Sequence, residues 1–188
     1  MKQITNCLLG LGLLLISLHQ SFAQNTLNLA GLSASSTSTV AYSLRRLSTG
    51  YTGNLIEVRR SSDNTTANIG YDGSGNLDVA ALTTFVGAGD GFIRTWYDQS
   101  GNANNGVQSS NSLQPQIVSS GTVLLANSRP VIRCNGTTYI DGGTSSYGIT
   151  GAHTLNAIYN FQSGTVQHII DRVLTGGGNP LTSITGSN

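Results

Sequence analysis

The residues best able to do chemistry in this chain of 188 residues are its eight carboxylates, which lie scattered along the sequence. Two facing carboxyl groups, one protonated as an acid and one ionised as a nucleophile or base, would be capable of glycoside hydrolysis. Asp98 and Asp171 both end apolar stretches that predict strands, but their spacing in sequence does not show that they meet. Glu57 lies inside a predicted strand, and Asp78 is placed to cap a helix. The residues themselves therefore assign no catalytic pair.

The stretch FIRTWYDQSGNANNGVQ, residues 92–108, places Asp98 at the corner where an apolar strand ends. A carboxylate followed by amide, hydroxyl and glycine residues could supply oxygen ligands to calcium. The same pattern is typical of a turn in which the aspartate accepts backbone N–H groups. Because only one carboxylate is present locally, we interpret Asp98, Gly101 and Asn102 as a structural turn.

A second loop, YDGSGNLD at residues 71–78, alternates Asp72, Ser74 and Asn76 in the manner of a calcium loop. However, Gly75 and Asp78 do not occupy the positions that the EF-hand spacing gives to its glycine and its glutamate. The sequence therefore assigns neither a metal site nor a cofactor.

Exposed aromatic side chains are the remaining groups that could bind a ligand, because the C–H faces of sugar rings pack well against aromatic surfaces. The candidates are Trp96, Tyr97, Tyr139 and Tyr147. Trp96, the one tryptophan, is expected to anchor the core. Tyr147 lies in the polar stretch GTSSYGITG and is the aromatic residue most expected to be exposed.

Cys134 is the one cysteine that follows the amino-terminal apolar run, so no intrachain disulfide is expected in the mature chain. No pattern in the sequence ties His153 or His168 to this thiol, as a nucleophile would need. We interpret Cys134 as a small buried apolar side chain.

Residues 1–23 have the features of a secretory signal peptide. Lys2 gives a positive start, residues 8–18 form an apolar run, and residues 21–23 resemble a cleavage site. We expect cleavage near Ala23 and Gln24, a polar lead-in over 24–39 and one domain over 40–188, in a secreted or cell-surface protein. No later stretch is long and apolar enough to span a bilayer.

The nine basic and eight acidic residues nearly balance, and charged residues make up 9% of the chain, compared with about 25% in an average soluble domain. The basic residues form no stripe, as a nucleic-acid footprint would require. The composition therefore excludes a nucleic-acid partner.

The apolar spacing predicts a mainly β chain. Val40, Leu44 and Leu47 predict a short helix over 40–50, and Asp78 and Gly87 can cap a second helix between them. Alternation predicts a strand that has Ile56 and Val58 on one face and Leu55, Glu57 and Arg59 on the other. Other short strands, separated by turns, are predicted near residues 67–71, 92–97, 116–118, 122–125, 130–134, 137–140, 155–161 and 166–171. This order predicts a sandwich of antiparallel sheets with two small helices attached.

The chain contains three blocks in a characteristic order, AYSLRRLSTGYTGNLIEVRRSSDNTTANIG, DVAALTTFV and TWYDQSGNANN. Together they resemble the N-terminal half of the α-L-arabinofuranosidase B catalytic domain, glycoside hydrolase family 54. The resemblance covers about residues 40–171. Similar stretches also recur in secreted bacterial proteins with lectin-like jelly-roll domains.

The resemblance implies a concanavalin A-like antiparallel β-sandwich (jelly roll) with one or two short helices, incomplete at its C-terminus. It also implies release of terminal L-arabinofuranose from arabinan or arabinoxylan with retention, and a scaffold role for the YDQSGN block. The family's glutamate nucleophile and aspartate acid correspond to positions beyond Asp171. His168 and Ile169 stand where the family has two adjacent cysteines. We expect Tyr147, His168 and Asp171 to contact the polysaccharide, and we assign no catalytic residue.

Three hypotheses follow. The chain is either an arabinofuranosidase-B-type hydrolase that lacks its catalytic carboxylates and is inactive alone, or a lectin-like module that binds polysaccharide without cleaving it. The third hypothesis is a fragment with no independent activity, because missing strands would leave an apolar sheet face uncovered.

Overall fold

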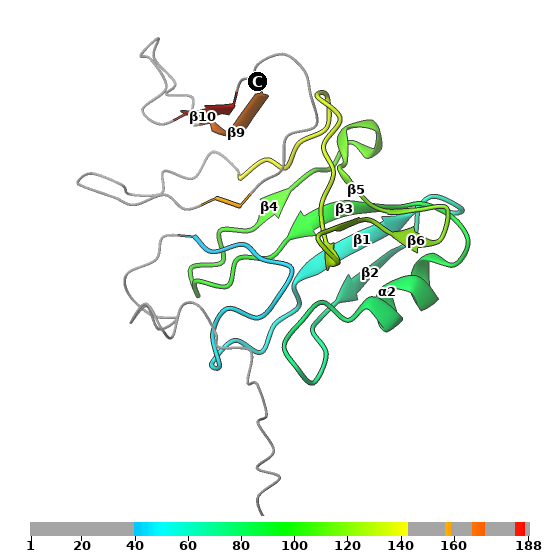
Figure 1. Cartoon of the computed structure of the whole chain (residues 1–188), viewed down its shortest axis with the longest axis horizontal. Coiled ribbons are helices and arrows are strands. Elements are labelled where there is room, and N and C mark those ends of the chain that lie inside the picture. The colour runs from blue at the N-terminus through cyan, green and yellow to red at the C-terminus, as the bar shows by residue number, and fades with distance from the viewer. Residues whose placement is uncertain (1–39, 143–156, 159–166, 172–182, 187–188) are drawn as a thin grey trace, which may run out of the picture.

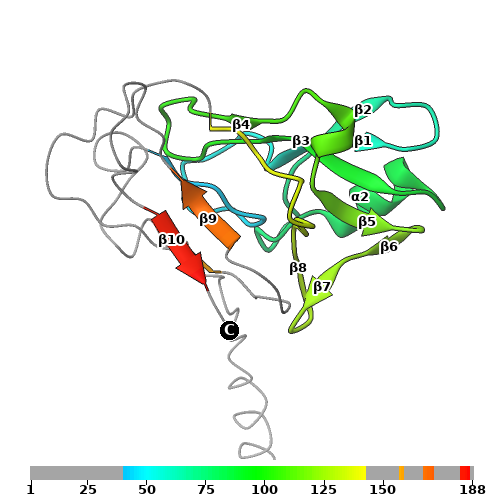
Figure 2. The ribbon, with the colours of Figure 1, turned by 90° about the horizontal axis from the view of Figure 1, so that it is seen from above.

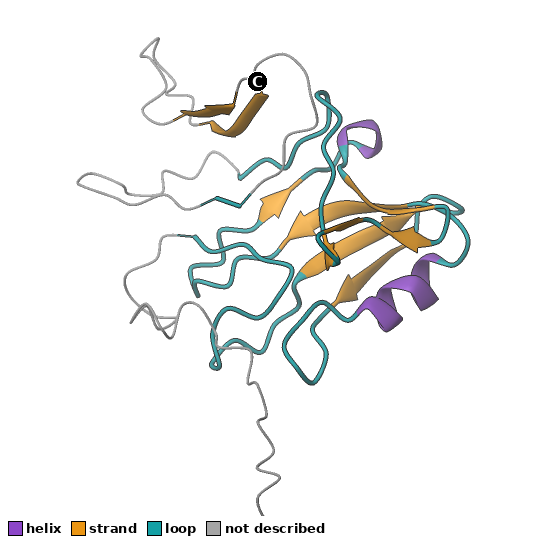
Figure 3. Ribbon diagram, in the orientation of Figure 1, coloured by secondary structure: helices purple, strands orange, loops and turns teal. Residues whose placement is uncertain are grey.

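The computed structural model describes residues 40–142, 157–158, 167–171 and 183–186. Within these ranges the chain is mainly β, with antiparallel strands curled into sheets and one short α-helix (Figures 1 and 3), which is consistent with a β-sandwich. The expected signal peptide and the lead-in over 24–39 lie outside the described residues. None of the helices in the described ranges has the length and apolar character needed to cross a bilayer.

The main sheet has six strands, in the order β2–β1–β3–β5–β6, with β4 paired to β3 as well. β3 is central, because β1 pairs with one side of it while β5 and β4 pair with the two halves of its other side. The strands are β1 (Ile56–Arg60), β2 (Thr66–Ile69), β3 (Gly91–Trp96), β4 (Gly106–Val107), β5 (Gln116–Ser119) and β6 (Thr122–Val123).

The burial predicted for one face of β1 is confirmed, and the other face is buried as well. Ile56 and Val58 are fully buried, as expected. Leu55 and Arg59, predicted for the opposite face, are also buried, so that face is covered too. The pairing of β1 with β3 shifts register between Glu57 and Val58, which leaves Arg94 without a paired residue on β1.

The helix α2 (Val79–Val86) has the caps that the sequence predicts. The side chain of Asp78 accepts the N–H of Ala81 at 2.9 Å, and Gly87 follows the last turn at a φ of 66°. Leu82 and Val86 are its buried residues. α2 contacts β1 and both end strands, β2 and β6, so the sheet curls around the helix (Figure 1).

The remaining elements are short. They are a 3₁₀ turn, η1 (Asn111–Leu113), the hairpin of β7 (Leu125–Ala126) with β8 (Arg129–Pro130), and the hairpin of β9 (Gln167–Asp171) with β10 (Ser183–Gly186). The β7–β8 hairpin stands off the main sheet (Figure 2). The strand predicted over 137–140 is absent, and only Asp141 makes a bridge there, to Val107.

The buried core joins α2 to the main sheet, and each fully buried leucine or isoleucine contributes about 1.5–3 kcal/mol relative to an exposed one. A methyl group on Gly91 would lie 3.0 Å from Val86 and 3.1 Å from Val118, so the start of β3 needs glycine to pass between helix and strand. The core residues are Leu55, Ile56, Val58, Ile69, Leu77, Leu82, Val86, Ile93, Ile117, Val118 and Val123.

The predicted helix over 40–50 is wrong. The segment is irregular, with a bend, a turn at its end and Arg45 in an antiparallel bridge to Asn76. The N–H of Arg46 donates to the carbonyl of Gly75 at 2.7 Å. The backbone groups of Arg45 and Arg46 are hydrogen-bonded to residues far along the chain and not to a helical turn. Tertiary contacts therefore override the helical spacing of the apolar residues.

Candidate functional site

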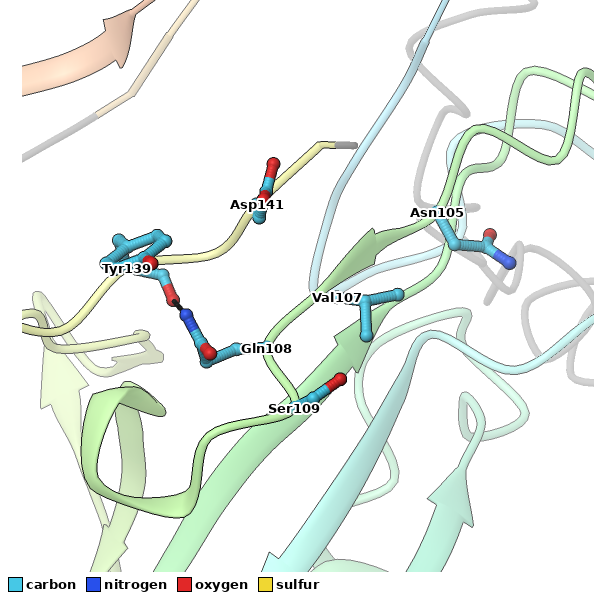
Figure 4. Close-up of a pocket in the computed structure, with 6 residues that line it drawn as sticks. All are labelled: Asn105, Val107, Gln108, Ser109, Tyr139 and Asp141. Atoms are coloured by element: carbon cyan, nitrogen blue, oxygen red, sulfur yellow. Dashed lines mark hydrogen bonds between the residues drawn. The ribbon is translucent and has the colours of Figure 1, made fainter. Parts of the chain in front are cut away.

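An open hollow of about 330 Å³ lies between two segments that are distant in sequence, residues 105–109 and 139–141 (Figure 4). The first segment contains β4, and the second follows the β7–β8 hairpin. Its lining mixes one aromatic ring, one aliphatic side chain, one carboxylate, two amides and a hydroxyl, from Asn105, Val107, Gln108, Ser109, Tyr139 and Asp141.

The two segments are joined by a short antiparallel bridge. The N–H of Val107 donates to the carbonyl of Asp141 at 2.7 Å, and the N–H of Asp141 donates back to Val107 at 3.2 Å. Gly106 lies under this bridge, where a methyl group would meet Ile140 at 2.5 Å. The close approach of the two segments therefore depends on glycine at position 106.

The side chain of Gln108 links the two segments at the base of the hollow, which we call its floor. Gln108 is 6% exposed. Its amide oxygen accepts the N–H of Ser110 at 3.0 Å, and its amide nitrogen donates to the carbonyl of Tyr139 at 3.4 Å. Its backbone carbonyl accepts a bond of 2.8 Å from the amide of Gln114. Hydrogen bonds to Ser110, Gln114 and Tyr139 therefore hold Gln108 in place.

A buried polar chain continues from this floor into the sheet. The amide oxygen of Gln114 accepts Nε of Arg59 at 2.7 Å, and Asn64 accepts Nη1 of the same guanidinium at 2.7 Å. The guanidinium also lies over the ring of Phe92, 4.7 Å from its centre. Arg59 thus connects β1 to the loop that carries Gln108, with partners for its buried donors.

The rim of the hollow is partly apolar and exposed. Tyr139 is 49% exposed and Val107 is 39% exposed, and both belong to the exposed large hydrophobic residues of the described chain. The side chains of Asn105, Val107 and Ser109 extend to one side of their segment, as alternate residues of a strand do (Figure 4). The lining of the hollow therefore combines an exposed aromatic residue with several hydrogen-bonding groups.

The Asp98 corner is a second polar cluster, and it is buried. Oδ1 of Asp98 accepts the N–H groups of Ala41 and Ser100, each at 2.8 Å. Oδ2 accepts the hydroxyl of Ser100 at 2.6 Å and the N–H of Asn104 at 3.1 Å. Both carboxylate oxygens therefore accept hydrogen bonds within the turn, and Oδ1 also binds the amino-terminal segment at Ala41. Gly101 follows at a φ of 94°, a left-handed conformation that favours glycine.

Gln99, the next residue, is fully buried and binds the same amino-terminal segment. Its amide oxygen accepts the N–H of Leu47 at 2.8 Å, and its amide nitrogen donates to the carbonyls of Ser43 and Arg45 at 3.2 and 2.9 Å. Asn102 donates its N–H to the hydroxyl of Ser100 at 3.2 Å, within the turn. We call the hydrogen-bonded stretch Asp98–Asn102 the DQSGN clasp.

Glu57, the one glutamate, pairs with Arg94 at 3.0 Å and accepts the hydroxyl of Thr95 at 2.8 Å. Burial by itself raises the pKa of this carboxyl group. Hydrogen bonds from Thr95 and Thr66, together with the charge of Arg94, outweigh the burial and lower its pKa overall. A lowered pKa keeps Glu57 ionised and unsuited to act as a general acid.

The carboxylates of Asp63, Asp72 and Asp90 also serve turns and segment contacts. Asp63 binds Arg60 through both oxygens, and the bonds from Arg60 and Thr65 hold its pKa far below the usual range. Asp72 accepts the N–H groups of Ser74 and Asn76, each at 2.9 Å, in its own turn. Asp90 accepts the N–H of Ser120 at 2.8 Å. Over the described ranges, no three acidic, histidine or cysteine side chains are grouped as a metal site would need.

The residues expected to contact polysaccharide fall mostly beyond what the structure describes. Tyr147 lies outside the described residues. His168 and Asp171 lie in β9, opposite Thr185 and Ser183, and their side chains are not among those described.

Of the other aromatic candidates, Trp96 packs against the core and stacks on Tyr42 with ring centres 5.4 Å apart. Tyr97 donates its hydroxyl to the side chain of Asn68 at 2.7 Å. Of the three aromatic candidates that the structure describes, Tyr139 is therefore the exposed one. Cys134, predicted to be a small buried apolar side chain, is an exposed free cysteine next to the turn at Asn135, so this prediction is wrong.

Sequence reasoning considered Tyr139 as an aromatic candidate and assigned Asp141 no role in catalysis or binding. It missed Asn105, Gln108 and Ser109, which belong to a polar stretch with no distinctive spacing. No pattern in the sequence pairs residues 105–109 with 139–141, because a single bridge and a buried glutamine bring them together.

Comparison with known proteins gives one family. The model of the alpha-L-arabinofuranosidase B catalytic domain matches residues 32–168. Two solved structures are similar to part of the chain: a family 54 α-L-arabinofuranosidase soaked with a cyclic sulfate inhibitor, and an arabinofuranosidase complexed with arabinofuranosyl-alpha-1,2-xylobiose. For each, the identity is 36%, the match covers 37% of this chain and 15% of the other, and the TM-score is 0.35. No curated protein gives a significant match.

Proposed function

Because the chain belongs to the α-L-arabinofuranosidase B catalytic family, we propose that it binds polysaccharides that carry terminal L-arabinofuranosyl residues, such as arabinan and arabinoxylan. The match over residues 32–168 is the observation that carries this proposal. The composition supports it, because a nearly uncharged surface rich in hydroxyl and amide groups suits a neutral polyhydroxylated ligand.

We further propose that this chain by itself does not hydrolyse the glycosidic bond. A retaining glycosidase needs one carboxyl group that stays protonated and a second that is free to attack. The carboxylates of Glu57, Asp63, Asp72, Asp78, Asp90 and Asp98 all accept hydrogen bonds that maintain the fold. The lowered pKa of Glu57 opposes the acid role, and the buried contacts of Asp98 oppose the nucleophile role.

The alternative is a non-catalytic lectin-like module, secreted or displayed at the cell surface. The exposed Tyr139 lines one hollow together with Asn105 and Ser109, which supports this alternative, because ligand sites combine apolar surface with a few placed polar groups. This module would retain polysaccharide without changing it.

Two assays on the mature chain, residues 24–188, test the proposal together. We expect retention on arabinan or arabinoxylan in affinity electrophoresis, and no release of aryl alcohol from an aryl α-L-arabinofuranoside. Measurable release that scales with protein concentration would refute the proposed inactivity. Failure to be retarded by either arabinan or arabinoxylan would refute the proposed ligand class. Mannan in the same gel serves as the control polysaccharide.

A further inference from the structure

We propose that the hollow between residues 105–109 and 139–141 is a glycan-binding subsite, in which the ring of Tyr139 packs on the face of a sugar and Asp141 accepts its hydroxyl groups. This inference rests on the proposed function, since the ligand class comes from the family, and it adds the place and residues of binding.

The backbone of Tyr139 is held in place, and the residue is 49% exposed. The N–H of Tyr139 donates to the carbonyl of Leu113 at 3.0 Å, and its own carbonyl accepts the amide of Gln108. Both backbone groups of the residue are thus fixed to a second segment. Because the backbone is fixed, only the two torsions of the tyrosine side chain have to be ordered when a ligand packs on the ring, so the entropic cost of binding is small.

The polar groups that line the hollow have the chemistry that a sugar needs. Hydroxyl groups of a sugar both donate and accept. Ser109 can do both, the amide of Asn105 can donate while its oxygen accepts the N–H of Asp98 at 3.0 Å, and the carboxylate of Asp141 accepts strongly. Val107, which faces Asp141 across the bridge, adds a second apolar surface at 39% exposure. A volume of about 330 Å³ suits the end of an oligosaccharide rather than a large ligand.

Other ligand classes fit the hollow less well. Among the described residues that line it, none is basic, which opposes an anionic ligand. Asp141 is the one carboxylate among them, which opposes a calcium ion, since that ion takes several oxygen ligands of this kind. The mixture of polar and apolar groups opposes a lipid chain. A neutral carbohydrate is the class that uses the ring and the polar groups together.

Isothermal titration of the mature chain with arabino-oligosaccharides, or with the oligosaccharides of an arabinoxylan digest, tests this assignment. We expect Tyr139→Ala to weaken binding at least about tenfold, because the sugar loses its aromatic surface. Tyr139→Phe, which keeps the ring, is expected to bind within about twofold of the wild type. Asp141→Asn, which keeps the shape of the side chain, is expected to weaken binding about three- to tenfold.

Leu125→Ala is the matched control, because it removes a large apolar side chain that is 59% exposed on β7, away from the hollow. Thermal unfolding of each variant separates lost binding from lost folding. If the wild type binds and both Tyr139→Ala and Asp141→Asn bind as tightly, the subsite is refuted while the proposed function stands. If the folded wild type binds none of these glycans, the proposed function fails and the subsite with it.

Discussion

The carboxylate of Asp98 accepts the backbone N–H of Ala41 at 2.8 Å, although 57 residues separate the two in sequence. The neighbouring Gln99 binds the same segment through Leu47, Ser43 and Arg45. The DQSGN clasp therefore holds the segment 40–47 against the main sheet. Its oxygen atoms accept hydrogen bonds from within the fold, which accounts for a polar corner that is buried.

Replacing Asp98 by alanine is expected to destabilise the fold strongly. The change leaves the N–H groups of Ala41, Ser100 and Asn104 without their partner in a buried corner. We expect a loss of at least about 3 kcal/mol in the free energy of unfolding, measured by urea denaturation. Asp72→Ala is the control, because Asp72 accepts two N–H groups of an exposed turn and should cost about 1 kcal/mol. Equal losses in the two variants would contradict the role given to the clasp.

The elements that the sequence predicts well are those that local residues determine. α2 begins after Asp78 and ends before Gly87 because the cap side chain and the left-handed glycine lie in the same short stretch. The alternation of Ile56 and Val58 predicts one of the two buried faces of β1 in the same way. Neither element needs information from a distant part of the chain.

The parts that the sequence does not predict depend on distant partners. Residues 40–50 have helical apolar spacing, yet the side chain of Gln99 and the backbone of Gly75 provide hydrogen bonds that a non-helical chain can use. The hollow depends on the contact of Gln108 with Tyr139, across 31 residues. Apolar periodicity is read within one segment of the sequence, so it cannot predict either of these contacts between distant segments.

The stability of the protein is expected to decrease in acid through Glu57. Although burial raises the pKa of Glu57, the bonds from Thr95 and Thr66 and the charge of Arg94 lower it below its unfolded value. A lowered folded pKa means that the ionised carboxylate stabilises the fold above about pH 4.3. This contribution is lost as the pH falls through the folded pKa. Glu57→Gln should therefore be less stable than the wild type near neutral pH and show a smaller further loss in acid.

Urea denaturation of both proteins, from neutral pH to about pH 3, measures this difference. Arg94→Gln is the companion variant, because it removes the charge that contacts Glu57 at 3.0 Å and leaves Thr95 in place. Arg94→Gln should also make the unfolding free energy depend less on pH, but its effect should be smaller than that of Glu57→Gln. If Glu57→Gln loses as much unfolding free energy in acid as the wild type does, other carboxylates cause the loss.

The amino terminus is expected to be removed during export. Residues 1–23 have a positive start, an apolar run and a small-residue end, which together predict cleavage near Ala23 and Gln24. Expression of the full chain in a bacterial host, followed by intact-mass measurement of the exported protein, should give a product that begins at Gln24. Ala23→Arg, which places a large charged residue before the cleavage point, should accumulate the uncleaved form. Export of a protein that retains residues 1–23 would contradict the prediction.

Gly106 is expected to connect the stability of the fold to the geometry of the hollow. A methyl group at this position would lie 2.5 Å from Cγ2 of Ile140, the residue between Tyr139 and Asp141. Gly106→Ala should therefore displace both residues and cost about 1–3 kcal/mol of unfolding free energy, with weaker glycan binding in the same variant. Adding Ile140→Ala removes the clash, so the double variant should lose less than the sum of the single losses. Gly73→Ala, where nothing lies within 4 Å of the added methyl group, is the control and should change neither quantity. A Gly106→Ala protein as stable as this control would show that the two segments can separate without cost.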